Sequence, residues 1–269
     1  MSNVSVERYD DFTGGLNLRA DQFQLKRNES PDMLNVEVDP RGGLFARGGM
    51  REINSTAITG TWAPHKLYPF AGAIPYLMLA NGTKVLKSTG GNFTTLQYSA
   101  GNDVVATAAH GACMTTWGKT LYMTTGTSGS GGYSWASTDT YATALTASGT
   151  NPKDWQTTAD ASAHKMPTAE HITIHANKMV VANTIENGVA FPNRVRWSLE
   201  SIPDNWDKDD CIDFEGGGDG ITALAVVAGQ LVVFKPTAVY VVYGYDFADF
   251  QVVQLLSQLG ALFHEHVAV

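Results

Sequence analysis

Charged side chains are scarce in this sequence. They make up 16% of its 269 residues, whereas about a quarter is usual for a globular domain. Hydrophobic residues account for 43% and aromatic residues for 10%, which is enough for a packed core and excludes a wholly disordered chain. Much of the surface must then consist of Thr, Ser, Gly, Asn and apolar groups. Such a surface favours a subunit that packs against copies or partners, and an ordinary Thr-rich β protein is the alternative.

Positive charge is particularly low. The sequence has 18 Lys and Arg residues against 26 Asp and Glu residues, so its formal net charge is −8. Phosphates would be repelled rather than neutralised, which disfavours non-specific binding of DNA. A conduit through which DNA slides without sticking would have this sign of charge, although an acidic balance is also common in proteins of other kinds.

Cysteine is nearly absent. Cys113 and Cys211 are the only two, and no CxxC or Cys/His ligand cluster surrounds either of them. A disulfide framework and a structural zinc site are therefore not indicated. We expect both thiols to be buried as small apolar groups, in a protein assembled in a reducing cytoplasm.

Signals for export, for membrane insertion and for helices are also missing. Residues 1–8 have neither a basic start nor an apolar core, so they do not form a signal peptide. No apolar run approaches the roughly 18 residues of a membrane helix, because Lys235 and Pro236 interrupt the best candidate. Only residues 30–35 favour a helical turn, with Ser30 as a cap and Pro31 in the first turn.

Short strand pairs recur along the rest of the chain. In each pair two apolar runs flank a turn of two or three residues, and Asn81-Gly82 is the strongest of these hairpin signals. A further strand follows each pair. The predicted pairs are residues 76–80 with 84–88, 112–117 with 120–124, 172–176 with 179–183, and 223–227 with 231–234; the strands that follow are 94–98, 132–136, 194–198 and 238–243.

The spacing of these units predicts the fold. Their second strands begin near residues 84, 120, 179 and 231, and units of three or four strands at such intervals are typical of propeller blades. A run such as residues 231–234 is apolar throughout and needs cover on both faces, which stacked blades provide. We therefore predict an all-β fold, a β-propeller-like array of short antiparallel sheets with an extended N-terminal arm. A sandwich or a two-sheet barrel is the competing architecture.

The arm is expected at residues 1–56 and the propeller-like domain at residues 57–269. Residues 35–38 and 44–47 flank a Pro-Arg-Gly-Gly turn and predict a hairpin within the arm. Its two Arg-Gly-Gly triplets are better explained by turns than by RNA binding, because the protein is acidic.

Three places were candidates for metal ligands. His171 and His175 lie on one side of a predicted strand, and His264 and His266 share that spacing. Neither pair has a convincing third ligand nearby. The acid-rich residues 204–219 are a candidate calcium loop, but a turn whose Asp side chains satisfy its own backbone is the simpler reading. We expect no metal and no cofactor.

Motifs of the common enzyme classes are missing. The sequence contains no Asp-box of sialidase propellers, no Gly-x-Ser-x-Gly elbow, no phosphate-binding loop and no Gly-x-Gly-x-x-Gly after a strand. We expect a protein that is not an enzyme and has no catalytic residues.

Two stretches resemble the β-propeller tail proteins of bacteriophages, the nozzle or stabilisation proteins of short-tailed phages. The first runs from DFTGGLN at residues 11–17 to GLFARGG at 43–49, and the second from RVRWS at 194–198 through PDNW at 203–206 to the segment 218–244. The residues that carry the resemblance, which implies a structural role for each, are Gly14, Gly15, Leu16, Asn17, Asn35, Arg47, Gly49, Arg194, Arg196, Trp197, Ser198, Trp206, Asp219, Gly220, Ile221, Lys235, Tyr240 and Gly244.

The resemblance implies a virion protein that forms part of a ring around the DNA exit channel of a phage tail. It implies copies of the chain in a ring, sixfold by analogy, together with other tail or connector proteins, and DNA only as passing cargo. Tail assembly, genome retention and DNA ejection are the implied roles. The alternative is a propeller that binds or degrades host surface glycans.

Family members usually continue with another blade after the segment that matches residues 251–260. Here residues 266–269 are expected to begin a strand of a new blade, so closure of a ring of blades by this chain alone is in doubt. An unpaired strand is a liability in solution unless another segment covers it.

Overall fold

The structure is a computed structural model that describes residues 11–19, 24–30, 32–34, 36–39, 41, 43–47, 54–55, 58, 64–107, 111–126, 132–145, 166–186, 188–216, 220–264 and 267. It divides the chain into two compact units, Met1–Glu52 and Ile53–Val269, where the sequence placed the division after residue 56.

The smaller unit contains two short strand pairs. Strands β1 (Gly15–Leu16) and β2 (Glu29–Ser30) are parallel, and β3 (Val36–Val38) and β4 (Leu44–Ala46) form the antiparallel hairpin expected in the arm. The helical turn expected at residues 30–35 is wrong for its described part. Ser30 lies in β2, and its hydroxyl donates to the carbonyl of Asp32 (2.7 Å) instead of capping a helix.

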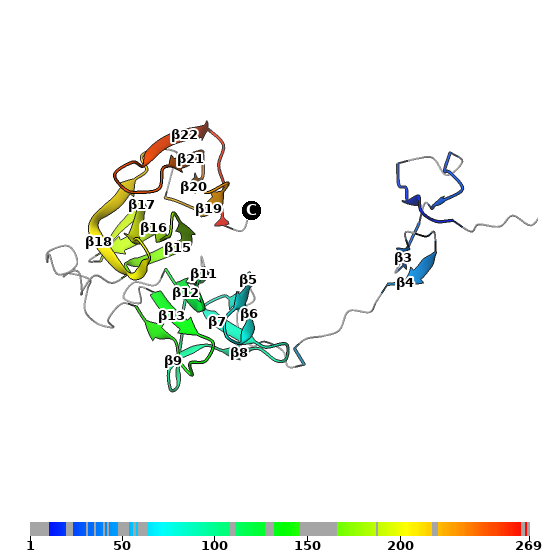
Figure 1. The fold of residues 1–269 in the computed structure, drawn as a ribbon. Coiled ribbons are helices and arrows are strands. Elements are labelled where there is room, and N and C mark those ends of the chain that lie inside the picture. Colours follow the sequence, from blue (N-terminus) through cyan, green and yellow to red (C-terminus); the bar gives the residue numbers. More distant parts are fainter. Residues whose placement is uncertain are drawn as a thin grey trace, which may run out of the picture. The chain divides into compact units, whose positions relative to one another are not determined.

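The larger unit consists mainly of four antiparallel sheets of four strands each, and every sheet is a meander of consecutive strands. Figure 1 shows the sheets one after another along the chain. Their strands are β5 (Pro64–Ala71), β6 (Pro75–Asn81), β7 (Lys84–Ser88) and β8 (Thr94–Thr95); β11 (Cys113–Trp117), β12 (Thr120–Thr124), β13 (Gly132–Ala136) and β14 (Thr143–Ala144); β15 (Thr168–His175), β16 (Lys178–Glu186), β17 (Val189–Leu199) and β18 (Ile202–Asp213); and β19 (Ala223–Val227), β20 (Gln230–Lys235), β21 (Ala238–Tyr243) and β22 (Gln251–Ser257). A small pair, β9 (Gln97–Ser99) with β10 (Asn102–Asp103), follows the first sheet.

The predicted hairpins are confirmed, and their turns show why the sequence specifies them. Gly82 and Gly118 have φ values of 55° and 60°, a region in which glycine has no steric cost. Asn177, in the turn between β15 and β16, also has a positive φ of 55°, which Asn tolerates better than most residues. The two-residue turns therefore set the register of the strands on either side.

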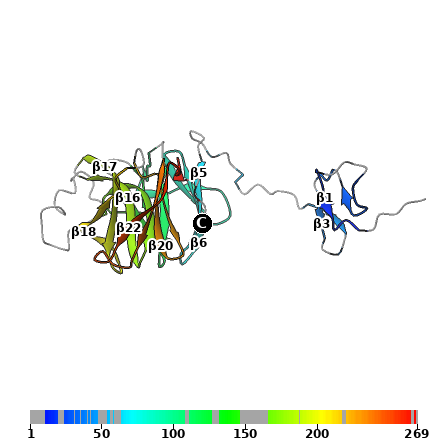
Figure 2. The ribbon, with the colours of Figure 1, turned by 90° about the horizontal axis from the view of Figure 1, so that it is seen from above.

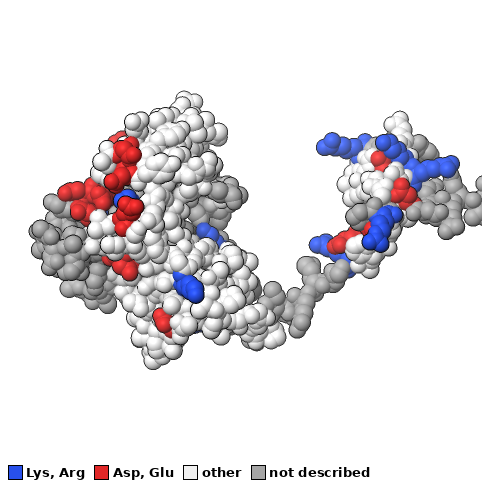
Figure 3. Space-filling view, in the orientation of Figure 1, with Lys and Arg blue, Asp and Glu red and all other residues white. Residues whose placement is uncertain are grey.

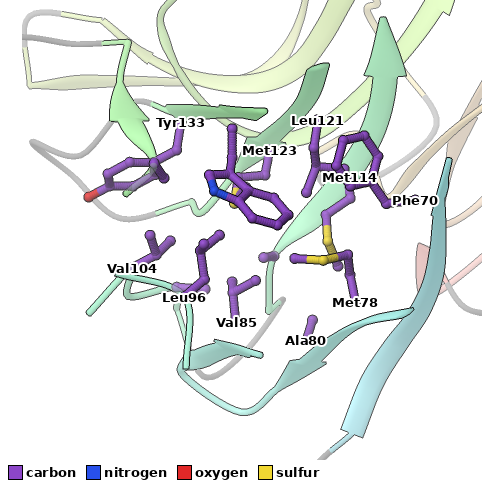
Figure 4. Packing of buried hydrophobic residues seen from close by; sticks show 14 residues of the cluster. Phe70, Met78, Ala80, Val85, Leu96, Val104, Met114, Leu121, Met123 and Tyr133 are labelled. Carbon is purple, nitrogen blue, oxygen red and sulfur yellow. The ribbon is translucent and has the colours of Figure 1, made fainter. Parts of the chain in front are cut away.

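Layers of buried side chains alternate with the sheets. One cluster joins the first two sheets through residues such as Met78 and Met123, as Figure 4 shows. A second, with Trp206, lies between the second and third sheets. A third, with Trp197, lies between the third and fourth sheets. Because both faces of the inner sheets are covered by neighbours, their central strands can be apolar throughout, as expected for blades.

The first strand of each sheet lies toward a common centre. Strand β11 contacts both β5 and β15, and β15 contacts β19. We call this meeting place of β5, β11, β15 and β19 the hub. Figure 2 shows the larger unit in the view turned by 90°. The fold is all-β and propeller-like, and the four sheets do not close a ring. Among the described residues, no helix is long and apolar enough to cross a membrane.

Candidate functional site

The family-like residues of the smaller unit hold its parallel pair together. Gly15 has a φ of 65°, and a Cβ on Gly14 would lie 2.6 Å from the Glu29 side chain, so both positions need glycine. The Asn17 side chain donates to Glu29 (3.0 Å), while Leu16 is exposed. This part of the resemblance consists of residues with local structural contacts.

Some predicted residues cannot be placed. Asn35, Gly49 and Asp219 lie outside the described residues, as does His266 of the second histidine pair. Arg47 follows β4 and is exposed.

Arg194 and Arg196 form a buried ion network inside the third sheet. Arg196 donates to both oxygens of Glu186 (2.6 and 3.0 Å), and Arg194 donates to Glu186 (3.0 Å) and through two bonds of 2.7 Å to Asp213. Burial alone would raise the pKa of Glu186, but the hydrogen bonds and charge of Arg196, together with Thr184 and Arg194, lower it. The carboxylates that they bind lie on β16 and β18 of their own sheet.

Two tryptophans anchor opposite faces of that sheet. Trp197 packs toward the fourth sheet and Trp206 toward the second, so each tryptophan belongs to a different buried layer. Ser198 between them is buried, accepts from the amide of Met179 (2.9 Å) and donates to the carbonyl of Leu199 (3.0 Å).

A second group of family-like residues fastens the fourth sheet to the third. The buried ammonium of Lys235 donates to the Asn193 side chain (2.9 Å) and to the carbonyl of Phe214 (2.8 Å). The Tyr240 hydroxyl donates to the carbonyl of Glu215 (2.7 Å). These bonds reach from β20 and β21 to β17 and the end of β18, so the resemblance marks a joint between two sheets.

Three further family-like residues, Gly220, Ile221 and Gly244, lie where two backbone segments approach each other closely. A Cβ on Gly220 would lie 2.7 Å from the side chain of Pro192, and the amide of the next residue, Ile221, donates to the Pro192 carbonyl (2.8 Å). Gly220 is therefore required by close packing and not by a turn. Gly244 has a φ of 113° and faces the backbone of Asp249.

The acid-rich stretch is mostly a strand, which corrects the expectation of a turn. Its residues 204–213 lie in β18, an edge strand of the third sheet, where charged side chains discourage pairing with other chains. Figure 3 shows the acidic side chains of the larger unit gathered at this outer edge.

The described residues contain no group of three or more His, Cys, Asp or Glu that is placed to hold a metal ion. His171 and His175 do not converge on one point. The His171 ring reaches the carbonyl of Ile221 (3.1 Å), whereas the His175 ring lies against Phe250.

The segment after β22 returns to the hub and contacts all four sheets. The amide of Ala261 donates to the carbonyl of Lys235 (3.1 Å), and the Ala261 carbonyl accepts from the Thr222 hydroxyl (2.6 Å). His264 then lies 3.0 Å from the Lys66 ammonium, 3.8 Å from the Cys113 sulfur, and stacked on the His171 ring. We call residues 260–264 the clasp, because they tie the first strands together at the hub.

No sequence signal identified this cluster, because its members are far apart along the chain. Cys113 is buried as expected, but it has polar neighbours. Cys211 is only half-buried, so the expectation of burial is wrong for this thiol.

Both end sheets carry apolar residues on their outer faces. On the fourth sheet, Val232, Val239 and Val241 form a cluster with Phe234 on the face away from the third sheet. Val253 and Leu256 of β22 extend this face by register and are 47% and 41% exposed. On the first sheet, Leu67, Leu79 and Leu86 form a row that points away from the second sheet. Leu67 is 59% exposed, whereas Leu79 and Leu86 are buried.

Comparisons with known proteins give the fold little outside support. No family model matches the chain and no curated protein matches it. Among solved structures, YCF48 bound to a D1 peptide is 10% identical, with a TM-score of 0.43 over 72% of this chain and 54% of that one. The extracellular domain of a hybrid two-component system from B. thetaiotaomicron is 10% identical with a TM-score of 0.38 over 75% and 28%. The CNH domain of AfRom2 is 10% identical with a TM-score of 0.37 over 82% and 80%.

The chain thus spans 54% and 28% of the first two of these structures. At such low TM-scores, the propeller-like assignment rests on the strand pairing and layered cores of the chain itself.

Proposed function

We propose that this protein is a non-enzymatic structural component of a bacteriophage tail, assembled in the host cytoplasm, whose copies join head to tail in a ring around the DNA exit channel. The observation that carries the assembly part is the pair of apolar outer faces, one at each end of the stack of sheets. The assignment to a phage tail rests on the resemblance of the motifs.

The two faces suit each other. Each is a sheet face built like those buried between the sheets of one copy, with aliphatic rows and no charged residue among the named positions. Burying the positions that are still exposed, Leu67, Val253 and Leu256, is favourable by about 25 cal/mol per Å². Contact between different faces of identical subunits is heterologous, and it closes into a ring when the rotation divides the circle.

The clasp leaves no room for a DNA channel among the four sheets of one copy. Residues 260–264 fill the hub with contacts to β5, β11 and β15. We therefore place the DNA channel at the centre of the ring of copies rather than among the sheets of one copy. The net charge of −8 per copy would keep DNA phosphates from binding the wall.

Two single substitutions test the head-to-tail arrangement. Val253→Lys places a charge on the outer face of the fourth sheet, and Leu67→Lys does so on that of the first. Each variant alone should lose the ring, because each keeps only one working face. An equal mixture of the two should form a dimer, because the intact faces still match. Ile202→Lys, at another exposed apolar residue, is the matched control and should assemble like the wild type.

Mass photometry and electron micrographs of the purified protein give the readout. A wild-type protein that stays monomeric at every concentration, or variants that assemble normally, would refute the arrangement. The phage assignment is tested separately by labelling this protein in virions, since a label away from the tail would refute it even if the rings form. Glycan hydrolysis by the purified protein would favour the alternative function.

A further inference from the structure

Cys113 lies among basic groups that come from three other sheets or their extensions. Its sulfur is at the start of β11 and only 5% of the residue is exposed. Lys66 on β5, His171 on β15 and His264 in the clasp surround it. A buried cysteine that serves only as a small apolar group is usually surrounded by apolar side chains and not by basic ones.

His171 is oriented as a base. Its Nε2 lies 3.1 Å from the carbonyl of Ile221. Because a carbonyl can only accept, Nε2 carries a proton, and the other ring nitrogen of the neutral imidazole is basic. The ring also stacks on that of His264, which lies 3.8 Å from the Cys113 sulfur, and His171 helps to lower the pKa of Cys113. A nucleophile, a base and a third group that orients the base are the arrangement that activates nucleophiles in proteins.

His264 and Lys66 are two further basic residues close to the Cys113 sulfur. The sulfur lies 3.8 Å from Nε2 of His264, and this nitrogen lies 3.0 Å from the Lys66 ammonium. The Nδ1 of His264 is buried without a hydrogen-bond partner among the described residues. The carbonyl of Ile172, also 3.8 Å from the sulfur, is the neighbour that favours the protonated thiol.

The balance of these groups favours the thiolate. Burial alone would raise the pKa of Cys113, but its hydrogen bonds with His171 and His264 and the charge of Lys66 bring that pKa well below the ordinary value. Cys211 provides the contrast within the same chain, since burial raises its pKa.

We propose that Cys113 is an activated, modifiable thiol that reacts with small hydroperoxides, with His171 as the base and His264 as a positioning residue. The thiolate sulfur attacks one peroxide oxygen, so that an S–O bond forms while the O–O bond breaks. The His171 imidazole has taken up the thiol proton when the thiolate formed, and it passes this proton to the leaving hydroxide, which becomes water. The sulfur is oxidised to a sulfenic acid and the peroxide is reduced.

The low exposure of Cys113 limits which reagents can reach its sulfur. A sulfur with so little exposure excludes large electrophiles, whereas hydrogen peroxide is a small neutral molecule. This separates the site from ordinary surface thiols, whose reactivity follows exposure and thiolate content together.

The test exposes the intact chain to hydrogen peroxide and then quenches it in denaturant that contains dimedone, which traps sulfenic acids. Mass spectrometry assigns each adduct. We expect adducts on Cys113 before the more exposed Cys211. In the Cys211→Ser variant, the rate should reach its plateau at a pH below that of a free thiol. His171→Gln and His264→Gln should each move the rise of the rate to higher pH. Lys87→Gln, at a lysine outside the cluster, should leave the profile unchanged.

Circular dichroism and the unfolding midpoint of each variant separate activation from folding. A folded histidine variant with the wild-type pH profile would refute the proposal. So would preferential labelling of Cys211, or an intact protein in which Cys113 reacts only after denaturation.

Discussion

At the scale of single residues, the polar groups buried in this protein are matched to specific partners. Glu186 accepts from both Arg194 and Arg196, and the Lys235 ammonium donates to Asn193 and to a backbone carbonyl. Removing one member of such a set leaves the others buried without compensation, which costs more than the set contributes when intact. These residues therefore contribute to the stability of the fold.

Glu186→Gln should lower the free energy of unfolding by about 3 kcal/mol, because it leaves the buried Arg196 without its counter-charge. The pKa of Glu186 is lowered in the folded state, so its contribution is complete above the pKa of the unfolded chain. That contribution is lost as pH falls through the lower folded pKa. Urea unfolding of both proteins across this acid range should show the difference shrinking as pH falls.

The half-exposed pair Lys84–Asp103 (3.7 Å) provides the control. Asp103→Asn should change stability by less than about 1 kcal/mol. An equal effect of both substitutions would contradict the distinction between buried and surface pairs.

Gly260→Ala should release the clasp. A Cβ at this position would clash with the backbone carbonyl oxygen of Lys235, and the backbone cannot move aside as a flexible side chain can. We expect a loss of about 1–3 kcal/mol, typical of overpacking, measured by thermal unfolding. Amide exchange at Ala261 should also become faster. Gly91→Ala is the matched control, because no atom lies within 4 Å of its added Cβ.

At the scale of elements, the hairpins with Asn and Gly turns were predictable, and the edge strands were not. Strand β5 carries Pro64 and Pro69, which argue against a central strand but are tolerated at a sheet edge. Strand β18 is rich in aspartate and resembled a loop, although an edge strand accepts such charges. In both cases the position in the sheet overrides local propensity.

The candidate site was less predictable than the fold for a related reason. The arginine and lysine motifs were recognised, but their partners Glu186 and Asn193 have no distinctive spacing from them. The cluster around Cys113 joins four separate segments. A close approach between residues more than a hundred positions apart leaves no local pattern in a sequence.

Lys235→Met should weaken the joint between the third and fourth sheets. It keeps much of the side-chain volume but leaves the carbonyl of Phe214 and the Asn193 side chain without this donor, at a cost of about 1–3 kcal/mol for each buried group. Chemical denaturation gives the measurement. Lys119→Met, at an exposed turn residue, should have almost no effect, and equal losses would contradict the role of Lys235.

At the scale of the whole molecule, the two units have different sources of stability. All four clusters of buried hydrophobic residues lie in the larger unit, between Phe70 and Val242. Within its described residues, the smaller unit has only two-stranded pairs, and such pairs are marginal in isolation. The larger unit should therefore fold without the smaller one, whereas the smaller unit needs a surface on which to pack.

Deleting residues 1–52 should leave the thermal midpoint of the larger unit nearly unchanged, because its layered cores are intact. The same deletion should weaken the assembly of copies, since we expect the arm to become ordered on a neighbouring subunit, where its exposed Leu18 and Leu34 would be covered. Calorimetry measures the first effect and mass photometry across a concentration series measures the second.

A truncated protein that assembles as well as the intact chain would show that the outer faces of the end sheets suffice. A truncated protein that fails to fold would show instead that the arm completes the larger unit. The Leu67→Lys variant separates these cases, because it blocks one outer face while keeping the whole arm.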